Sequence, residues 1–584
     1  MIKKIQEYLI ENNLDAYIVF TNDDHGSEYV VDYFKARAFL SGFTGSAGTL
    51  LITRNKSYLW TDGRYFLQAE KQLEATNTVL MKMGEEGVPS IYQFIASLSR
   101  NPKVAFDYKL VTTLFVTTLL ERIKGVEIYN EEDLIDKIWC KRPKMVKSKA
   151  YFISDKEAGE SLESKMERLI AAILENNAKY ALISSLDDLA WLFNLRGNDI
   201  THNPVNYAYA LISKDKKIIY IDHEKLNKKC LARFNELNID VKEYADIYND
   251  IALIDDNVLF DITKTNYKLY SLIKKRVFIN TFPTTAFKAI KNPTELKNIK
   301  KAHIIDGVAM VKFMHYLKNN VGKIAMTEIS LSDKLEDFRK ESKDFLDLSF
   351  DTICGYKENG AIIHYSATPL TNKEVLKESL LLVDSGAQYK YGTTDITRTF
   401  ALGKLTKAEK RAFTMVLKSH IAMSSMIFPK GVCGYGIDMV AREPLFKEYL
   451  DYNHGTGHGV GYLLNVHEGP QRVTMRNVTK ETLYPFAPGM ITSNEPGLYK
   501  GGSFGIRHEN LVVCVKKHEN EFGKFYGFEP LTYVPFDLDG VDKKLLSAEE
   551  VKWLNLYHKE CYKKLHNHLD KTLDKYLKKI TRPI

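Results

Sequence analysis

The sequence has little cysteine and no long apolar run. Its six cysteines are scattered through 584 residues, and no two form a CxxC pair, so they cannot support a disulfide framework and favour a reducing compartment. No 18 consecutive apolar residues occur, which argues against a membrane span. The opening MIKKIQEYLIENNLDAY reaches Glu and Asn before an apolar segment can form, so we expect no signal peptide. We therefore expect a soluble, cytoplasmic protein.

The chain also lacks a strong excess of one charge. Lys+Arg number 82 against 74 for Asp+Glu, which gives a formal net charge of +8. No dense basic block is present, so nucleic acid is not an expected partner. A composition of 45% hydrophobic and 27% charged residues is typical of globular proteins, and the length suggests three or four domains.

The first half of the chain contains an internal sequence repeat. Residues 9–20 (LIENNLDAYIVF) reappear as residues 173–184 (ILENNAKYALIS), an offset of 164. Both copies have a helical pattern that runs into a short aliphatic strand pattern. Further strand-like runs follow in each copy: GTLLIT and SYLWT in the first, YAYALIS and KIIYID in the second. We predict two similar α/β domains, with a chance match as the alternative.

A linker-like segment and a helix-start signal indicate the domain boundaries. Residues 139–150 (WCKRPKMVKSKA) are basic and contain a proline, as a linker would. Asn292-Pro293-Thr294-Glu295 is a helix-start signal that opens a third part. The predicted division is therefore 1–145, 146–290 and 291–584, with a charged helical extension from Ser547.

Two aspartates in the third part flank a turn-rich segment. Asp384 ends the apolar run LLLVD, and Asp395 begins DITRTF, with SGAQYKYGTT between them. The two runs are predicted to form a hairpin that brings both carboxylates to one end, with Thr397 and Thr399 on the Asp395 face. Buried paired carboxylates repel each other, and a cation removes that cost. Two turn-capping aspartates would give the same pattern.

Histidines and glutamates follow in unusual settings. HGTGHGVG contains His454 and His458 among glycines, which fits a strand or loop that approaches a ligand closely. A phosphate-binding loop is excluded because no GK[ST] is present. Glu495 precedes a Pro-Gly turn, and Glu509 enters an apolar strand, where an unligated charge would be costly. Such an oxygen-rich set suits two divalent ions such as Mn²⁺ better than a thiolate or tris-imidazole zinc site.

The order of Asp384, Asp395, His458, Glu495 and Glu509 along the chain resembles that of the five metal ligands in the pita-bread metallopeptidases. From end to end the chain is similar to the three-domain cytosolic Xaa-Pro aminopeptidases (aminopeptidase P, family M24B). The matching stretches are FTGSAGT, WTDGRYFLQAEKQ, LAWLFNLRGNDI, NPV, IIHYSATP, LLVDSGAQYKYGTTDITRT, DYNHGTGHGVG, NVHEGP and FGIRHEN. The resemblance implies two creatinase-like α/β domains before a pita-bread catalytic domain, which pairs into a homodimer.

The resemblance also implies a reaction and a set of ligands. Asp384 would bind one metal ion, His458 and Glu495 the other, and Asp395 and Glu509 both. The ions are expected to be Mn²⁺, with Zn²⁺ or Co²⁺ as alternatives. A bridging water or hydroxide would attack the bond before proline, while Glu495 carries a proton to the leaving nitrogen. This hydrolase would release the N-terminal residue from peptides with proline in second position.

The resemblance assigns further residues to the substrate. His364 would hydrogen-bond it near the scissile bond, and His454 and His467 would line the proline pocket and steady the tetrahedral intermediate. Arg64 would reach toward the peptide, with a domain-packing ion pair as its alternative. Satisfied structural histidines are the alternative for the three imidazoles.

Two neighbours of Glu509 complete the set. Arg507 could orient the carboxylates around the metals. His508 stands where relatives carry an apolar residue, and strand alternation should point it away from the metals.

Three other functions are alternatives to an Xaa-Pro aminopeptidase. A prolidase would share the ligands but usually has a single N-terminal domain. A non-catalytic pita-bread module would typically lack metal ligands, and a creatine-type hydrolase works without metal. The five intact ligands and the two-domain front argue against all three.

Overall fold

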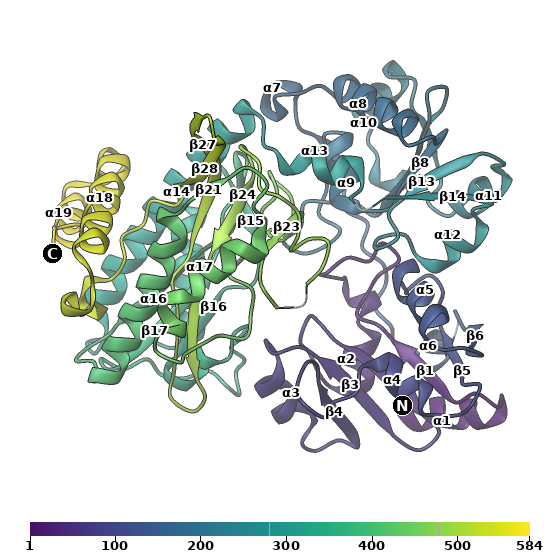
Figure 1. The fold of residues 1–584 in the computed structure, drawn as a ribbon, viewed down its shortest axis with the longest axis horizontal. Coiled ribbons are helices and arrows are strands. Elements are labelled where there is room, and N and C mark those ends of the chain that lie inside the picture. Colours follow the sequence, from purple (N-terminus) through teal and green to yellow (C-terminus); the bar gives the residue numbers. More distant parts are fainter. Residues whose placement is uncertain (133, 280, 477) are drawn as a thin grey trace. The chain divides into compact units, whose positions relative to one another are not determined.

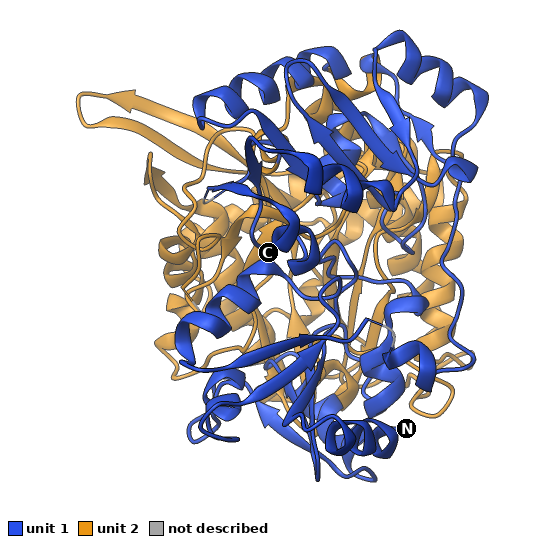
Figure 2. Ribbon diagram, turned by 90° about the vertical axis from the view of Figure 1, so that its right-hand side faces the viewer, with its two compact units in different colours: residues 1–155, 160–284 blue, residues 156–159, 285–584 orange. Residues whose placement is uncertain are grey.

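The structure is a computed structural model that describes residues 1–132, 134–279, 281–476 and 478–584. It divides into two units, shown in different colours in Figure 2. Unit 1 comprises residues 1–155 and 160–284, and unit 2 comprises residues 156–159 and 285–584. Each unit is described by itself below.

The N-terminal half of unit 1 is built on a six-stranded sheet (Figure 1). In sheet order the strands are β4 (Thr78–Lys82), β3 (Ser57–Thr61), β2 (Thr49–Thr53), β1 (Ala16–Val19), β5 (Lys103–Phe106) and β6 (Glu127–Asn130). The associated helices are α1 (Ile2–Glu11), α2 (Ala36–Ser41), α3 (Phe66–Leu73), α4 (Ile91–Ala96), α5 (Thr113–Arg122) and α6 (Leu134–Ile138). Both faces of the sheet are buried against apolar side chains, which explains why β1 is buried at every position.

The C-terminal half of unit 1 repeats this design. Its sheet runs β12 (Asp240–Lys242), β11 (Lys217–Ile221), β10 (Ala208–Ile212), β8 (Tyr180–Ile183), β13 (Asn257–Phe260) and β14 (Lys275–Phe278). Its helices are α8 (Leu162–Glu175), α9 (Leu186–Leu192), α10 (Lys228–Glu236), α11 (Asp246–Leu253) and α12 (Tyr267–Leu272). The short strands β7 (Tyr151–Phe152) and β9 (Leu195–Arg196) pair beside it, and β7 follows the irregular linker of residues 139–150.

The two sheets agree strand for strand in order and direction. In the first sheet, β1 pairs antiparallel with β2 and parallel with β5. In the second sheet, β8 pairs in the same way with β10 and β13. The helix-to-strand turn is repeated as well, since Asn13 and Asn177 both have φ of 53°. Asparagine tolerates this left-handed conformation better than most residues. The predicted duplication is therefore confirmed.

Several helices of unit 2 begin at side-chain caps. Asn292 accepts from the backbone N–H groups of Thr294 and Glu295, and the Glu295 carboxylate accepts from the Asn292 N–H. This capping box starts α14 (Pro293–Asn320) where the sequence predicted a helix, and such caps contribute about 1 kcal/mol. The helices that follow are α15 (Glu328–Lys340), α16 (Lys407–Ser425), α17 (Gly434–Phe446), α18 (Ala548–Leu565) and α19 (Lys571–Ile580). The helix α18, capped by Ser547, confirms the predicted extension. Segments α7 (Asp155–Ala158) and α13 (Pro283–Ala289) lie where the chain passes between the units.

The sheets of unit 2 are antiparallel. The largest runs β21 (Ile427–Pro429), β28 (Gly523–Pro530), β27 (Asn510–Asn520), β24 (Ile491–Asn494), β22 (Gly457–Gly459) and β23 (Glu468–Val473). A three-stranded sheet runs β16 (Ile353–Tyr356), β17 (Leu380–Ser385) and β20 (Ile396–Ala401), and β25 (Gly497–Lys500) pairs with β26 (Phe504–Arg507). Helices α16 and α17 pack on one another, and α16 contacts β24 and β28 while α17 contacts β23 (Figure 1).

The predicted hairpin between the two aspartates is only partly correct. Strands β17 and β20 do pair antiparallel, and Asp384 lies opposite Thr397. The segment between them is more than a turn, because β18 (Ala387–Tyr389) and β19 (Gly392–Thr393) form a small hairpin that pairs with β15 (Phe345–Leu348). Burial of Tyr389 in a small apolar cluster explains why these turn-like residues take up extended structure.

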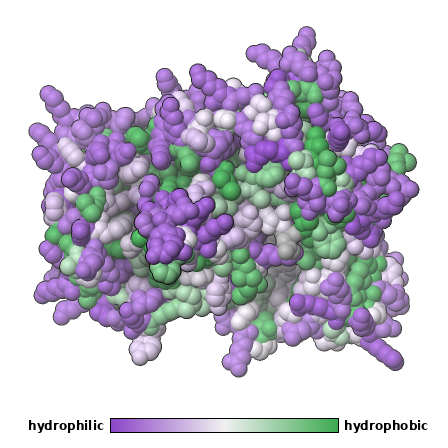
Figure 3. Space-filling view, turned by 45° about the horizontal axis from the view of Figure 1, so that its top comes forward, coloured by the Kyte–Doolittle hydropathy of each residue, from purple (hydrophilic) through white to green (hydrophobic). Residues whose placement is uncertain are grey.

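On the face drawn in Figure 3, hydrophilic side chains surround small groups of apolar ones. Among the described residues, no helix combines the length and the apolar character that crossing a membrane requires.

Candidate metal centre

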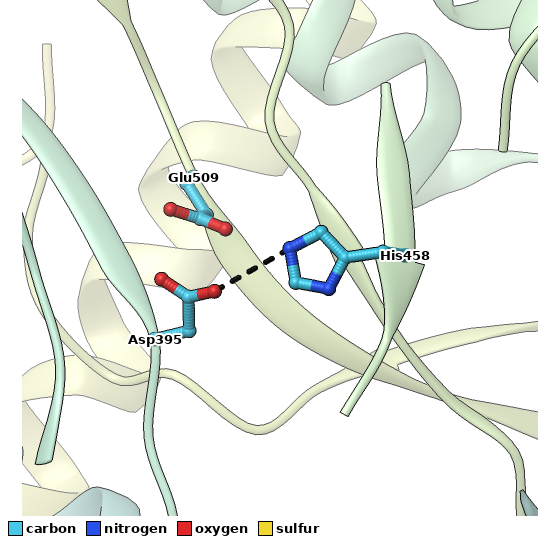
Figure 4. Close-up of side chains that lie close together, drawn as sticks. All are labelled: Asp395, His458 and Glu509. Atoms are coloured by element: carbon cyan, nitrogen blue, oxygen red, sulfur yellow. Dashed lines mark ion pairs between the residues drawn. The ribbon is translucent and has the colours of Figure 1, made fainter. Parts of the chain in front are cut away.

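Three predicted ligands meet in unit 2. Asp395, His458 and Glu509 each offer a ligand atom, and these atoms all lie within 4.8 Å of one another. In Figure 4 the two carboxylates and the imidazole ring point toward one another from three separate segments. The His458 Nε2 atom is 3.5 Å from Oδ2 of Asp395. This is a spacing that a metal ion could bridge.

Of the other two predicted ligands, Glu495 contacts this cluster and Asp384 lies within electrostatic reach of it. His458 Nε2 lies 3.3 Å from Oε1 of Glu495. The Ser493 hydroxyl accepts from the His458 backbone N–H at 3.0 Å and is 3.1 Å from the same Glu495 oxygen. Asp384 belongs to β17, the strand that pairs with β20. Its charge contributes to the raised pKa of both Asp395 and Glu509, so it lies within electrostatic reach of them.

Strand ends place the ligands. Asp384 lies in β17, whereas Asp395 directly precedes β20 and Glu509 directly precedes β27. The Glu509 backbone N–H donates to the Thr397 carbonyl at 3.1 Å, and the Thr397 hydroxyl donates to Glu509 Oε2 at 2.8 Å. This double contact joins the two sheets at the cluster. The predicted face containing Asp395 and Thr397 is therefore the face that meets Glu509.

The cluster carries concentrated negative charge in a dry setting. Burial, reinforced by neighbouring carboxylates, raises the pKa of both Asp395 and Glu509 well above their usual range. Burial also raises the pKa of Glu495 to about 7, with the Asp384 charge adding to the rise and Arg507 opposing it. Without a cation, burial and crowding disfavour the ionised form of each group, and a bound metal would remove that cost.

The donor set fits divalent cations. Oδ1 of Asp384 and Oε1 of Glu509 are buried with no hydrogen-bond partner among the described residues. Buried carboxylate oxygens normally have donors, so these two are available as ligands. Four carboxylates and one imidazole are hard and borderline ligands that suit Mn²⁺, Zn²⁺ or Co²⁺.

An arginine and a tyrosine link the cluster to a predicted substrate histidine. Arg507 Nη2 donates to Asp384 Oδ2 at 2.5 Å, and its Nη1 donates to the Tyr499 hydroxyl at 2.7 Å. The Tyr499 hydroxyl is 2.8 Å from Nε2 of His454. The predicted contact of Arg507 with a carboxylate is confirmed, while Tyr499 was missed because nothing in GLYK marks a tyrosine that bonds both Arg507 and His454.

The three predicted substrate histidines differ in their surroundings. His454 is buried, and its Nδ1 is 2.7 Å from the Gly455 carbonyl. The His467 ring stands edge-on to the His458 ring, with centroids 4.3 Å apart. His364 follows η3 (Lys357–Ala361) and is partly exposed. His467 therefore contacts the cluster directly, whereas His454 is linked to Asp384 through Tyr499 and Arg507.

Arg64 belongs to unit 1, where it has acidic partners. Its Nε and Nη2 donate to the Asp62 carboxylate, each at 2.8 Å, and Nη1 is 3.8 Å from Glu28. Its guanidinium also lies over the Tyr65 ring at 5.3 Å. These contacts match the ion-pair alternative, and its role toward a peptide stays a prediction.

His508 points into the core, as strand alternation predicts. Its ring contacts Phe413 at 4.3 Å and Phe536 at 5.5 Å between centroids. Burial, with the charge of Arg398 adding to it, lowers its pKa well below the usual range, so the ring is neutral.

Family models match nearly the whole chain. Residues 1–138 and 141–295 match two models described as creatinase/prolidase N-terminal domains. Residues 297–516 match metallopeptidase family M24, and residues 524–584 match the C-terminal region of that peptidase family. A probable Xaa-Pro aminopeptidase P from Botryotinia fuckeliana is 40% identical over 583 residues, which cover 96% of this chain and 88% of that protein.

The chain belongs to the Xaa-Pro aminopeptidase P family of M24 metallopeptidases.

Other members of the aminopeptidase P family match at similar levels. Aminopeptidase P1 of Arabidopsis thaliana is 37% identical and covers 98% of this chain and 97% of its own. The crystal structure of X-prolyl aminopeptidase from Caenorhabditis elegans, described as a cytosolic enzyme with a di-nuclear active site, matches with a TM-score of 0.94 at 33% identity. The match covers 98% of this chain and 95% of the nematode chain. The predicted fold, with creatinase-like domains before the catalytic domain, is confirmed.

Proposed function

We propose that this protein is an aminopeptidase that releases the N-terminal residue from peptides with proline in second position. The observation that carries the proposal is the convergence of Asp395, His458 and Glu509 in a chain similar to Xaa-Pro aminopeptidases from end to end. The class, a metallo-exopeptidase, follows from the same family membership.

The five predicted ligands would hold two divalent ions, which we propose to be Mn²⁺. Asp384 would serve one ion, His458 and Glu495 the other, and Asp395 and Glu509 both. Unpartnered oxygens on Asp384 and Glu509 and the raised pKa of Asp395 support this assignment. Ions bound here would lower the pKa of water and polarise a carbonyl.

Side chains of this protein would carry the proton and hold the substrate. Glu495, with a pKa near neutrality in the metal-free protein, suits proton transfer toward the leaving nitrogen. His467 lies against His458, and His454 is linked to Asp384 through Tyr499 and Arg507. An imidazole aimed at a developing oxyanion could contribute about 2–4 kcal/mol. His364 would bind the substrate near the scissile bond, and Arg64 would contact the peptide.

Proline specificity would depend on shape. An Xaa-Pro bond is a tertiary amide without an N–H, so no acceptor can select it. Rings of His454, Tyr452 and Tyr499 lie against one another, with centroids 4.8 Å and 5.4 Å from His454. Such rings can form a wall that fits a pyrrolidine.

We also propose a cytoplasmic homodimer that associates through unit 2. The six cysteines are free, as a reducing compartment would keep them, and the nematode relative is described as cytosolic. Tyr435 and Met439 are exposed one turn apart on α17, so they offer apolar area for a second copy. Sedimentation should give a dimer that Met439→Glu weakens, and a wild-type monomer at micromolar concentration would contradict this.

Product analysis by mass spectrometry on Mn²⁺-loaded protein tests the function. The substrates are an Xaa-Pro-Yaa tripeptide, an Xaa-Ala-Yaa tripeptide and an Xaa-Pro dipeptide. We expect release of the first residue from the proline tripeptide only. Cleavage of the dipeptide alone would instead indicate a prolidase, and no cleavage with metal bound would indicate a non-catalytic protein.

A further inference from the structure

The loop that carries His364 is attached to a buried carboxylate outside the metal cluster. Glu328 is the first residue of α15, and its side chain is fully buried. Its acidic group lies at a helix N-terminus, where backbone N–H groups favour negative charge. The loop of residues 357–373 passes around this carboxylate.

Glu328 contacts both ends of that loop. Its Oε1 accepts from the Tyr356 backbone N–H at 2.7 Å, directly before the loop, and its Oε2 accepts from the Lys373 backbone N–H at 2.9 Å. The Glu328 backbone N–H donates in turn to the Lys373 carbonyl at 3.1 Å. One residue therefore closes the base of the loop.

The same carboxylate also holds the loop interior. The Tyr365 hydroxyl donates to Glu328 Oε2 at 2.8 Å, and the Asn359 amide nitrogen is 3.0 Å from each carboxylate oxygen. Burial, with the nearby Glu328 charge contributing, raises the pKa of Tyr365, so its hydroxyl remains a donor. Three donor groups of the loop, and the Tyr356 N–H directly before it, thus share one carboxylate.

The opposite side of the loop rests on the strand that leads to the metal cluster. A Cβ on Gly505, in β26, would lie 1.7 Å from the Gly360 carbonyl oxygen, so the two backbones are in direct contact. Arg507 Nη2 is 3.4 Å from the Ile363 carbonyl. His364 accordingly stands between Ile363, which touches the arginine bound to Asp384, and Tyr365, which is bonded to Glu328.

We propose that Glu328 is a positioning residue that sets the place of His364 by holding loop 357–373. This inference rests on the proposed function, in which His364 binds substrate. Glu328 does not touch the metal cluster, so its effect should reach the reaction through the loop alone. Removing its charge should change substrate handling and leave metal content intact.

The test compares Glu328→Gln with a matched control on the same helix. Glu336 is partly exposed and pairs with Lys340, so Glu336→Gln makes the same chemical change without touching the loop. Glutamine at 328 keeps the size but replaces one acceptor by a donor, which opposes the Tyr356, Lys373 or Tyr365 donor. We expect kcat/KM to fall about 10–100-fold in Glu328→Gln, with unchanged metal content, and to stay constant in Glu336→Gln.

A double-mutant cycle separates positioning from general damage. On a His364→Ala background, Glu328→Gln should lower kcat/KM by no more than about threefold, because the group it positions is already gone. The same loss in both backgrounds would overturn the proposal. Tyr365→Phe, which removes one bond, gives a milder version of the cycle if Glu328→Gln folds poorly.

Hydrogen exchange gives a readout that needs no activity. Amides of residues 357–373 should exchange faster in Glu328→Gln than in wild type or Glu336→Gln, and unchanged protection would overturn the proposal. If wild type cleaves no peptide, the proposed function fails, and the exchange result still decides whether Glu328 holds the loop.

Discussion

Unit 2 contains two kinds of buried carboxylate, and they are satisfied in opposite ways. Glu328 accepts from three donor groups of one loop and from the Tyr356 N–H directly before it. Asp395 and Glu509 lie among other carboxylates, and one oxygen of Glu509 has no donor among the described residues. Burial of an acidic side chain thus indicates a ligand site only when its donors are missing. Where donors surround the charge, the carboxylate organises protein structure instead.

The largest effect should come from neutralising a carboxylate that lacks donors. Glu509→Gln removes a charge shared by the cluster and should lower metal-dependent activity by at least about 10³-fold, because the amide binds cations weakly. Metal content by mass spectrometry and kcat/KM are the measurements. Full activity with normal metal content would contradict the ligand assignment.

The glycine contact of the His364 loop can be tested without touching either kind of carboxylate. In Gly505→Ala the new Cβ meets the backbone of Gly360, which cannot move aside as a side chain would. We expect the unfolding temperature to fall by roughly 5 °C or more and kcat/KM to fall at least about tenfold. Gly501→Ala is the control, since a Cβ there meets no atom within 4 Å. Equal unfolding temperatures and equal kcat/KM in the two variants would show that the contact between Gly360 and Gly505 is unimportant.

One substitution made at both kinds of site should give opposite shifts in the stability of the metal-free protein. Glu328→Gln leaves a donor unmatched and should lower the unfolding temperature by roughly 3–8 °C. Glu509→Gln relieves repulsion between buried charges and should leave it unchanged or raise it. Thermal unfolding of both variants in the presence of a chelator is the measurement. A larger decrease in unfolding temperature for Glu509→Gln than for Glu328→Gln would contradict the distinction between the two kinds of carboxylate.

The pH dependence of the metal-free protein should follow the cluster. Folding raises the pKa of Glu495 from 4.5 to about 7, so the folded state binds more protons than the unfolded state between these values. Its contribution to stability is therefore complete below pH 4.5 and is lost as pH rises through 7. We expect the unfolding temperature to decrease over this range, and both Glu495→Gln and saturating Mn²⁺ to flatten the curve. A curve as steep in Glu495→Gln would show that other groups cause it.

The smallest effect concerns a buried polar group that lacks partners but carries no charge. Both ring nitrogens of His508 are buried without hydrogen-bond partners among the described residues, and the ring is neutral. His508→Leu should retain metal and activity and shift the unfolding temperature upward by at most about 4 °C. Loss of metal in this variant would mean that His508 supports Glu509 directly.

The sequence predicted what depends on local pattern. The repeated helix-to-strand turn, the capped start of α14 and the strand ends that hold Asp395 and Glu509 were all visible as short motifs. These features depend on neighbours along the chain, and their residue types have few other uses.

The sequence could not predict features that join distant segments. Glu328 meets Lys373 from 45 residues away, and Tyr499 meets His454 across the same separation. Gly360 and Gly505 reveal their contact only when the backbones come together. A buried glutamate at a helix start looks like an ordinary cap residue in sequence, because donors that arrive from elsewhere leave no local signal.

The spread of the ligands along the chain has a consequence for synthesis. The strands of both sheets in unit 1 are complete by Phe278, whereas the metal cluster needs segments from Asp384 to Glu509. A ribosome therefore releases every strand of the two N-terminal sheets long before it releases the final ligand. The two N-terminal sheets can therefore fold before the metal cluster can form, and the complete ligand set exists only once residue 509 has been added.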